Sequence, residues 1–223
     1  MLERYRDIEV CKEDINSFIE LTKEDVAGVP EIQIRSISKG LIFFKRIFMQ
    51  NEVGYTHYSE CLISDALNLI HSLGIRSQRL YYMTYRSLIE NFVRVLLRYG
   101  DFNDNGVRNM FKDLRNEYGN MGTDFINYIE GEYGKCCNVI HSNAKAKLNL
   151  YLYYEELVHA DEMDQKTIDS CINTFCTFCN KAKEFMVENM SQSINESFYN
   201  HKELLAFLVG EKNYARLEKK WFE

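Results

Sequence analysis

The sequence predicts an all-α fold, an up-and-down helical bundle with extra helices at its N- and C-terminal ends. Only 1 proline and 11 glycines interrupt the 223 residues, so few positions break a helix. Apolar residues recur at the three- and four-residue spacing of amphipathic helices along most of the chain. The composition, with 46% hydrophobic residues including 15 tyrosines and 14 phenylalanines, is sufficient for a large aromatic core.

Two helices are expected in the N-terminal segment, residues 1–55. The first covers Leu2–Leu21, where apolar side chains share one helical face. A linker punctuated by Gly28 and Pro30 separates it from a second helix at Glu31–Met49. We expect this pair to pack on the bundle that follows.

The central bundle is expected over residues 56–190. Its first helix is His57–Leu73, with Gly74 in the position that a C-terminal helix cap prefers. Ser77 opens the most apolar helix, which is predicted to run to Tyr99 and to stop at Gly100.

Further along, a short charged helix is predicted at Val107–Tyr118, and the sequence GNMGT breaks it. A helix follows at Thr123–His141, capped by Thr123 or Asp124. The segment Leu148–His159 alternates like a strand, but helical neighbours favour a helix. Asp164–Met190 is then a long amphipathic helix.

The last 33 residues, 191–223, are expected to form a C-terminal helical extension of one or two helices around Gly210.

Charge and cysteine usage indicate a cytoplasmic protein. No run of roughly 18 apolar residues is present, so no membrane helix is predicted. The N-terminus is charged from its third residue and lacks the apolar region of a signal peptide. The 7 cysteines have no disulfide-framework spacing, and we interpret them as reduced thiols.

No cofactor or metal is predicted. The CxxC sequence at Cys176 and Cys179 lacks the second ligand pair of a zinc site, so both thiols are expected to pack in the core. Cys136 and Cys137 lie near the end of a helix, which does not favour a reactive thiolate. Glycine-rich phosphate loops and nucleophile-elbow motifs are absent from the sequence.

Two polar groupings stand out on otherwise apolar helices. Arg86 and Glu90 are four residues apart, so they share a face and can pair. His141 ends its helix between Asn138 and Asn143. Taken singly, each residue fits a solvated helix face or a helix cap. Burying them unpaired would be costly, so we expect Arg86, Glu90 and His141 to meet in one polar site.

Together these groupings resemble the HEPN superfamily (higher eukaryotes and prokaryotes nucleotide-binding domain). The resemblance rests on RSLIENFVRVL, which begins at Arg86, and on NVIHSN, which begins at Asn138, and it covers about residues 56–190. It implies an up-and-down helical bundle and a homodimer with its interface near His141. Catalytic members are metal-independent ribonucleases, many of them toxins of bacterial defence against phage, whereas other members are non-catalytic.

The resemblance also implies roles for single residues. His141 matches the family's histidine and would be the general acid or base. The family's motif is an arginine, then four to six residues, then the histidine. No arginine occurs within the six positions before His141, and Lys135 and Asn138 stand there instead. Arg86 or Lys135 would then stabilise the phosphate, Glu90 would hold Arg86, and Asn138 would orient groups.

RNA is the substrate that the resemblance implies. Tyr82, Asn143, Lys145 and Lys147 are the candidate substrate-binding residues. The formal charge of −6 is unusual for a nucleic-acid binder. It favours the alternative function, a non-catalytic helical interaction or regulatory protein that binds a protein or nucleotide partner.

Overall fold

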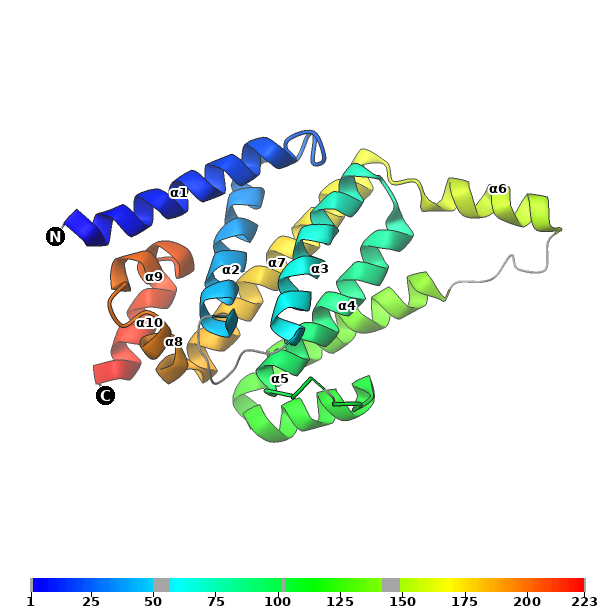
Figure 1. The fold of residues 1–223 in the computed structure, drawn as a ribbon. Coiled ribbons are helices and arrows are strands. Elements are labelled where there is room, and N and C mark those ends of the chain that lie inside the picture. Colours follow the sequence, from blue (N-terminus) through cyan, green and yellow to red (C-terminus); the bar gives the residue numbers. More distant parts are fainter. Residues whose placement is uncertain (1, 50–56, 102, 142–148, 223) are drawn as a thin grey trace.

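The computed structural model describes residues 2–49, 57–101, 103–141 and 149–222, and within them every regular element is a helix (Figure 1). The predicted all-α class is therefore confirmed. The helices are α1 (Leu2–Thr22), α2 (Glu31–Met49), α3 (His57–Gly74), α4 (Gln78–Leu96), α5 (Val107–Ile140), α6 (Leu150–Asp161), α7 (Gln165–Asn189), α8 (Ser191–Ser197), α9 (Lys202–Val209) and α10 (Glu211–Phe222).

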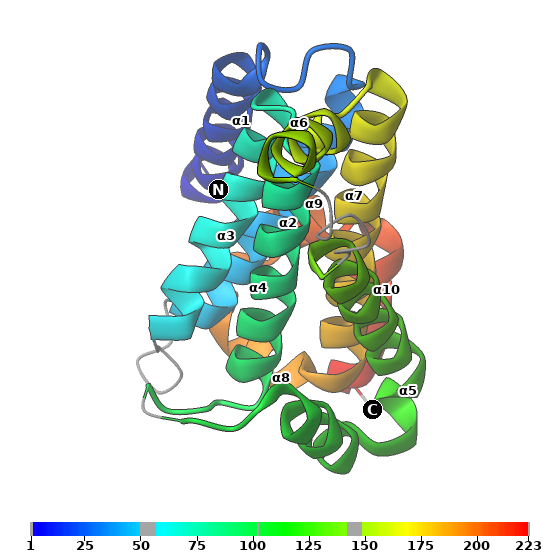
Figure 2. The same cartoon turned by 90° about the vertical axis from the view of Figure 1, so that its right-hand side faces the viewer.

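The bundle alternates in direction, as ring contacts between α4, α5 and α7 show. Phe92 of α4 contacts Phe125 near the start of the second half of α5, while Arg86 reaches Tyr133 further along it, so α4 and α5 are antiparallel. Phe178 of α7 contacts Phe92 at a centroid distance of 5.3 Å. Figure 2 shows α4 beside α3, with α5 and α7 on its other side. These three long helices therefore pack on one another in the core.

The core is aromatic and closed to solvent. Four residues at its centre, Leu88, Phe92, Phe175 and Phe178, are each at most 1% exposed. Edge-on and tilted ring pairs are the favoured geometry for such a core, because they oppose the negative face of one ring to the positive edge of another.

The helix α2 packs against α7 although some 140 residues separate them. Gln33 Nε2 donates to Asn173 Oδ1 at 2.5 Å. Midway along α2, a Cβ at Gly40 would lie 3.1 Å from the Cβ of Cys179, so glycine allows the two helices to approach closely. This contact joins the N-terminal segment to the bundle.

The C-terminal helices cover the far end of α2 and α7. Phe198 stacks on Phe43 of α2 at 6.0 Å, and Leu217 of α10 is fully buried. The indole N–H of Trp221 donates to the carbonyl of Ser191 at 3.0 Å. The N-terminal, central and C-terminal segments therefore contribute to one hydrophobic cluster.

Two predicted helix ends were wrong. Gly74 is the last residue of α3 and does not cap it from outside. A Cβ there would lie 2.5 Å from Asp25 Oδ1, so close packing by the α1–α2 connection explains the glycine. The left-handed residue after α3 is Arg76, with φ 60°. The helix α4 ends at Leu96, not at Tyr99, and Arg98 adopts φ 52° just beyond it.

The break predicted between Tyr118 and Thr123 is a kink. Helix continues on both sides of Gly119, whose φ of 52° and ψ of −143° turn the chain within α5. The cap expected at Thr123 or Asp124 is not used, because helix resumes directly after the glycine. Ser77 does cap α4, accepting from the Leu80 N–H at 3.1 Å.

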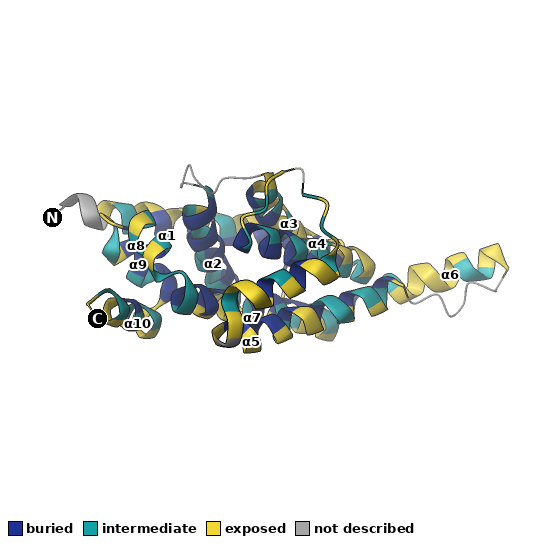
Figure 3. Ribbon diagram, turned by 90° about the horizontal axis from the view of Figure 1, so that it is seen from below, coloured by how far each residue is buried: buried dark blue, intermediate teal, exposed yellow. Residues whose placement is uncertain are grey.

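Helix α6 confirms the helical prediction for this region, and it projects from the bundle (Figure 3). None of its residues is buried. Among the described helices, none combines the length and apolar character needed to cross a membrane.

Candidate functional site

Arg86, Glu90 and Tyr133 form a closed hydrogen-bonded triangle between α4 and α5. The Arg86 Nε–H donates to Glu90 Oε1 at 3.1 Å and to the Tyr133 hydroxyl at 2.9 Å. The Tyr133 hydroxyl in turn donates to Glu90 Oε1 at 2.9 Å. The helical i,i+4 spacing aligns the first two side chains, and the antiparallel α5 brings the third.

Tyr133 also contacts the flat side of the guanidinium. Its ring centroid lies 5.2 Å from the Arg86 Cζ, within the range of a cation–π contact. Within the described chain, the two terminal amino groups of Arg86 donate no hydrogen bond, and the side chain is 33% exposed. The network thus fixes the plane of the guanidinium and leaves its two terminal NH2 groups available to a ligand.

Protonation in this network is set by its neighbours. Partial burial by itself would lower the pKa of Arg86, but the hydrogen bond to Tyr133 and the Glu90 carboxylate outweigh it and raise that pKa. Burial, followed by the negative charge of Glu90, raises the pKa of the Tyr133 hydroxyl. Arg86 is therefore a permanent cation and Tyr133 a permanent hydrogen-bond donor at neutral pH.

Glu90 also contacts a second arginine, on the same face of α4. Arg94 shares Glu90, with its Nη1 3.5 Å from Oε2, and its guanidinium lies 5.2 Å from the Tyr58 ring centroid. A second carboxylate lies nearby: burial, with a smaller contribution from the Glu90 charge, raises the pKa of Asp65. Two carboxylates and two guanidinium groups therefore share this region.

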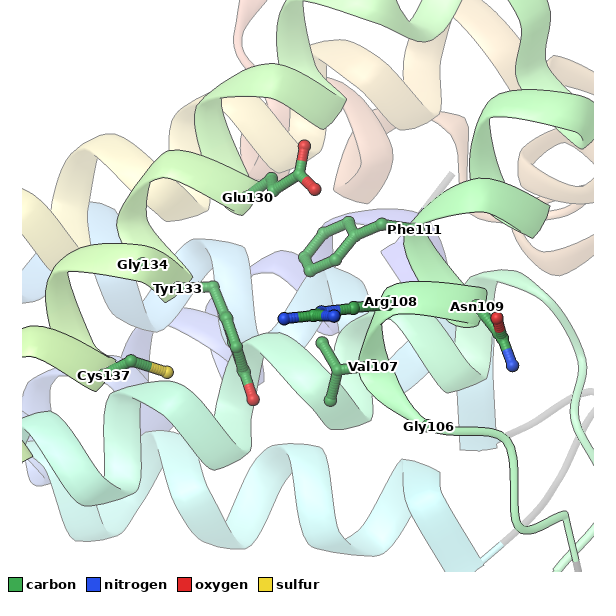
Figure 4. Close-up of a pocket in the computed structure, with 9 residues that line it drawn as sticks. All are labelled: Gly106, Val107, Arg108, Asn109, Phe111, Glu130, Tyr133, Gly134 and Cys137. Carbon is green, nitrogen blue, oxygen red and sulfur yellow. The ribbon is translucent and has the colours of Figure 1, made fainter. Parts of the chain in front are cut away.

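A cavity of about 630 Å³ adjoins the triangle, and Tyr133 belongs to both (Figure 4). Its wall is built by the two halves of α5 where they fold back at Gly119. Phe111 meets the Tyr133 ring edge-on at 6.0 Å, and the Arg108 side chain points toward Tyr133. The lining residues are Gly106, Val107, Arg108, Asn109, Phe111, Glu130, Tyr133, Gly134 and Cys137.

The cavity wall carries one carboxylate, Glu130, which forms an ion pair, and one arginine, Arg108, which has no such pair in the part of the chain that the structure describes. Glu130 pairs with Arg115 across the two halves of α5. Arg108 is exposed and has no ion-pair partner among the described residues. The cavity therefore combines aromatic walls with a cation available to a bound anion.

His141 lies apart from the triangle in a single chain. It is exposed at the C-terminal end of α5, where its N–H donates to the Cys137 carbonyl at 3.0 Å. Eight residues of helix separate it from Tyr133, a rise of about 12 Å. The structure brings Arg86 and Glu90 together, but no described contact joins His141 to either of them.

The remaining predicted catalytic residues point elsewhere. Lys135 pairs with Glu132 at 2.5 Å, and its place on α5 is about 200° around the helix from Tyr133. Asn138 is exposed and lines a separate hollow with Arg79 and Asp161. Neither residue contacts the triangle among the described interactions.

The structure describes one of the four predicted substrate-binding residues. Tyr82 is half-buried and meets Tyr81 edge-on at 5.4 Å. Asn143, Lys145 and Lys147 lie outside the described residues.

The cysteines are thiols in different surroundings. Cys136 is fully buried, and burial raises its pKa to about 12. Cys179 is also fully buried, against α2. Searched over the described residues, the chain has no cluster of histidine, cysteine and carboxylate groups suited to a metal ion.

Tyr133 is the residue that sequence reasoning missed. It lies 47 positions from Arg86, beyond the reach of helical periodicity.

Comparison of the chain with protein family models, with curated proteins and with solved structures found no match.

Proposed function

We propose that this protein is a HEPN-like RNA-binding protein that acts as a metal-independent ribonuclease, of the toxin type used in bacterial defence against phage. The observation that supports the proposal is the orientation of Arg86. Glu90 and Tyr133 hold its Nε, and its two terminal NH2 groups donate no hydrogen bond among the described residues. A guanidinium in this state suits bidentate contact with a phosphate.

The chemistry needs a proton acceptor and donor beside that phosphate. Attack by a ribose 2′-hydroxyl requires removal of its proton, and the departing 5′-oxygen requires a proton. His141 is the group proposed for this exchange, because an imidazole can accept one proton and donate another. Arg86 would stabilise the charge that develops on the phosphate.

His141 follows Tyr133, the partner of Arg86, by about 12 Å of helix, so we place the proposed active site between two copies of the chain. In this arrangement Arg86 of one copy and His141 of the other would act on one phosphate. Two equivalent sites would result from a two-fold axis.

A complementation experiment tests this arrangement. The variants Arg86→Ala and His141→Ala should each lose RNA cleavage by at least about 100-fold, measured on total RNA in EDTA. A mixture of the two inactive variants should regain cleavage, because one of the two shared sites in a mixed dimer keeps both wild-type residues. An inactive mixture would contradict the shared site.

Matched controls separate chemistry from folding. Arg35 pairs with Glu31 at the same four-residue spacing on α2, and Arg35→Ala should cleave RNA normally. His71 is an exposed histidine on α3, and His71→Ala should do the same. Wild-type protein that leaves RNA intact would refute ribonuclease activity.

The second candidate is a non-catalytic protein that binds RNA or a nucleotide. The distance between His141 and the triangle within one chain favours it. In that case Arg86→Ala should weaken binding of a labelled single-stranded RNA, His141→Ala should not, and no cleavage should accompany binding.

A further inference from the structure

A second cleft, of about 460 Å³, opens between α5 and α7 and shares no lining residue with the cavity beside the triangle. At one end the two helices are joined by stacked rings, Phe125 on Phe185, with a centroid distance of 4.6 Å. Beyond this contact the cleft is lined from α5 by Tyr128 and Glu132. From α7 it is lined by Lys166, Asp169, Ser170, Asn173, Thr174 and Thr177.

The sequence of α7 explains why the cleft is polar. The six lining residues of α7 follow the three- and four-residue spacing of one helical face. The opposite face carries apolar residues of the core, among them Phe175 and Phe178. Because α5 lies across from the polar face, that face borders an enclosed gap and not bulk solvent alone.

Glu132 brings a buried carboxylate to the cleft. The residue is 8% exposed, and its Oε1 accepts from Lys135 Nζ at 2.5 Å. The Lys135 side chain is 69% exposed, so this pairing comes from the solvent side. No described residue donates a hydrogen bond to the other oxygen, Oε2. A buried carboxylate is costly unless its oxygens are hydrogen-bonded, which makes Oε2 an acceptor for a ligand.

Two threonines add further acceptors to the wall. The Thr174 hydroxyl donates to the Ser170 carbonyl at 2.9 Å, and the Thr177 hydroxyl donates to the Asn173 carbonyl at 2.8 Å. Each hydroxyl hydrogen is thus used within the helix. The lone pairs of both oxygens remain to accept hydrogen bonds from a ligand.

The same wall also carries donors. The side-chain oxygen of Asn173 accepts from Gln33 Nε2 at 2.5 Å, which leaves its NH2 group to donate. Lys166 is exposed and has no ion-pair partner in the segments covered by the structure. The cleft therefore presents hydrogen-bond donors and acceptors side by side.

The charges of the lining select a neutral ligand. An anion would face two carboxylates, Glu132 and Asp169. A cation would meet the ammonium groups of Lys166 and of Lys181, whose Nζ lies 5.0 Å from the Tyr128 ring centroid. A hydroxyl group both donates and accepts, so a ligand that carries several hydroxyls suits this wall.

We propose that the cleft between α5 and α7 binds a small neutral sugar. Glu132 and Asp169 accept from its hydroxyls, Asn173 donates to its oxygens, and the Tyr128 ring packs against its C–H groups. The cleft volume lies within the range of about 300–1,000 Å³ that small-molecule sites occupy. The inference uses no residue of the Arg86 triangle and does not depend on RNA cleavage.

Ligand-observed NMR on the full chain tests the proposal. Saturation-transfer difference spectra with D-glucose, D-galactose, D-mannose and N-acetyl-D-glucosamine should give a saturable signal for at least one of them. Inorganic phosphate and spermidine, the charged probes, should not displace that sugar. In Glu132→Gln and in Asp169→Asn the dissociation constant for the sugar should rise at least about 10-fold, because each variant loses a charged acceptor.

Glu184→Gln is the matched control. Glu184 is exposed on α7 and does not line the cleft, so this variant should bind the sugar like the wild type. Circular dichroism checks folding, and Asp169→Asn, at a partly exposed site, keeps the test decisive if Glu132→Gln fails to fold.

Three results would each overturn the proposal: no saturable signal from any of the four sugars, displacement by phosphate or spermidine, or wild-type affinity in Asp169→Asn. Sugar binding without RNA cleavage would count against the proposed ribonuclease and leave the sugar site intact.

Discussion

The two sides of α4 are built on opposite principles. One side carries Tyr81, Tyr85 and Phe92, each at most 1% exposed and in contact with other rings. The other side carries Arg86 and Glu90, whose side chains are 33% and 19% exposed. A single helix thus contributes both to the closed core and to the candidate site.

The two sides of α4 differ in how much they contribute to the free energy of unfolding. Burial of large rings removes much apolar area from water, which is the main stabilising contribution to the fold. Partly exposed ion pairs contribute much less. The buried side of α4 should therefore contribute far more to stability than the charged triangle on its other side.

The largest expected effect is on the buried side. Phe92→Ala should lower the free energy of unfolding by about 3–5 kcal/mol, because it opens a cavity among four neighbouring rings. Urea denaturation measures the loss. Phe222→Ala, at a site 88% exposed, is the control and should change stability by less than about 0.5 kcal/mol.

The buried side should also make the protein sensitive to alkali. Burial raises the pKa of Tyr128 to about 12 and raises those of Tyr81 and Tyr85 above the ordinary value near 10. The folded chain keeps these protons when the unfolded chain loses them. Stability is therefore complete below pH 10 and falls as the pH rises above it, by up to about 1.4 kcal/mol per pH unit for each tyrosine.

Denaturation between pH 9 and 11 checks this dependence. Tyr128→Phe should make the decline shallower, whereas Tyr199→Phe, at a site 72% exposed, should not. An unchanged slope in Tyr128→Phe would show that this hydroxyl titrates normally in the folded protein.

A smaller effect is expected on the charged side. Glu90→Ala removes the acceptor shared by Arg86, Arg94 and Tyr133, and it should cost about 1–3 kcal/mol in urea denaturation. Glu9→Ala removes an acceptor from an exposed pair with Lys12 and should cost less than about 0.5 kcal/mol. Equal losses in the two variants would mean that the triangle is an ordinary surface ion pair.

The smallest effect on stability is expected at Tyr133. Tyr133→Phe keeps the ring and loses the hydroxyl, so stability should fall by only about 1 kcal/mol. RNA binding should fall about 10-fold, because Arg86 is no longer held in one plane. Titration of labelled single-stranded RNA measures it, and unchanged affinity would remove Tyr133 from the site.

The sequence allowed those parts of the fold to be predicted that depend on local periodicity. The stripe of apolar residues predicted both ends of α2 correctly, and the spacing of Arg86 and Glu90 predicted their pairing. Features that depend on distant contacts were missed. The close approach of Asp25 explains Gly74, and Tyr133 joins the triangle from another helix. No short-range pattern encodes either contact.

The contact between α2 and α7 has a consequence for synthesis of the chain. At about 5–20 residues per second, the ribosome needs roughly 6–25 s to proceed from the end of α2 to the start of α7. During that interval the side of α2 around Gly40 has no α7 to cover it. The nascent chain is thus exposed to aggregation until late in translation. Chaperones that bind apolar helices could bind α2 during that interval.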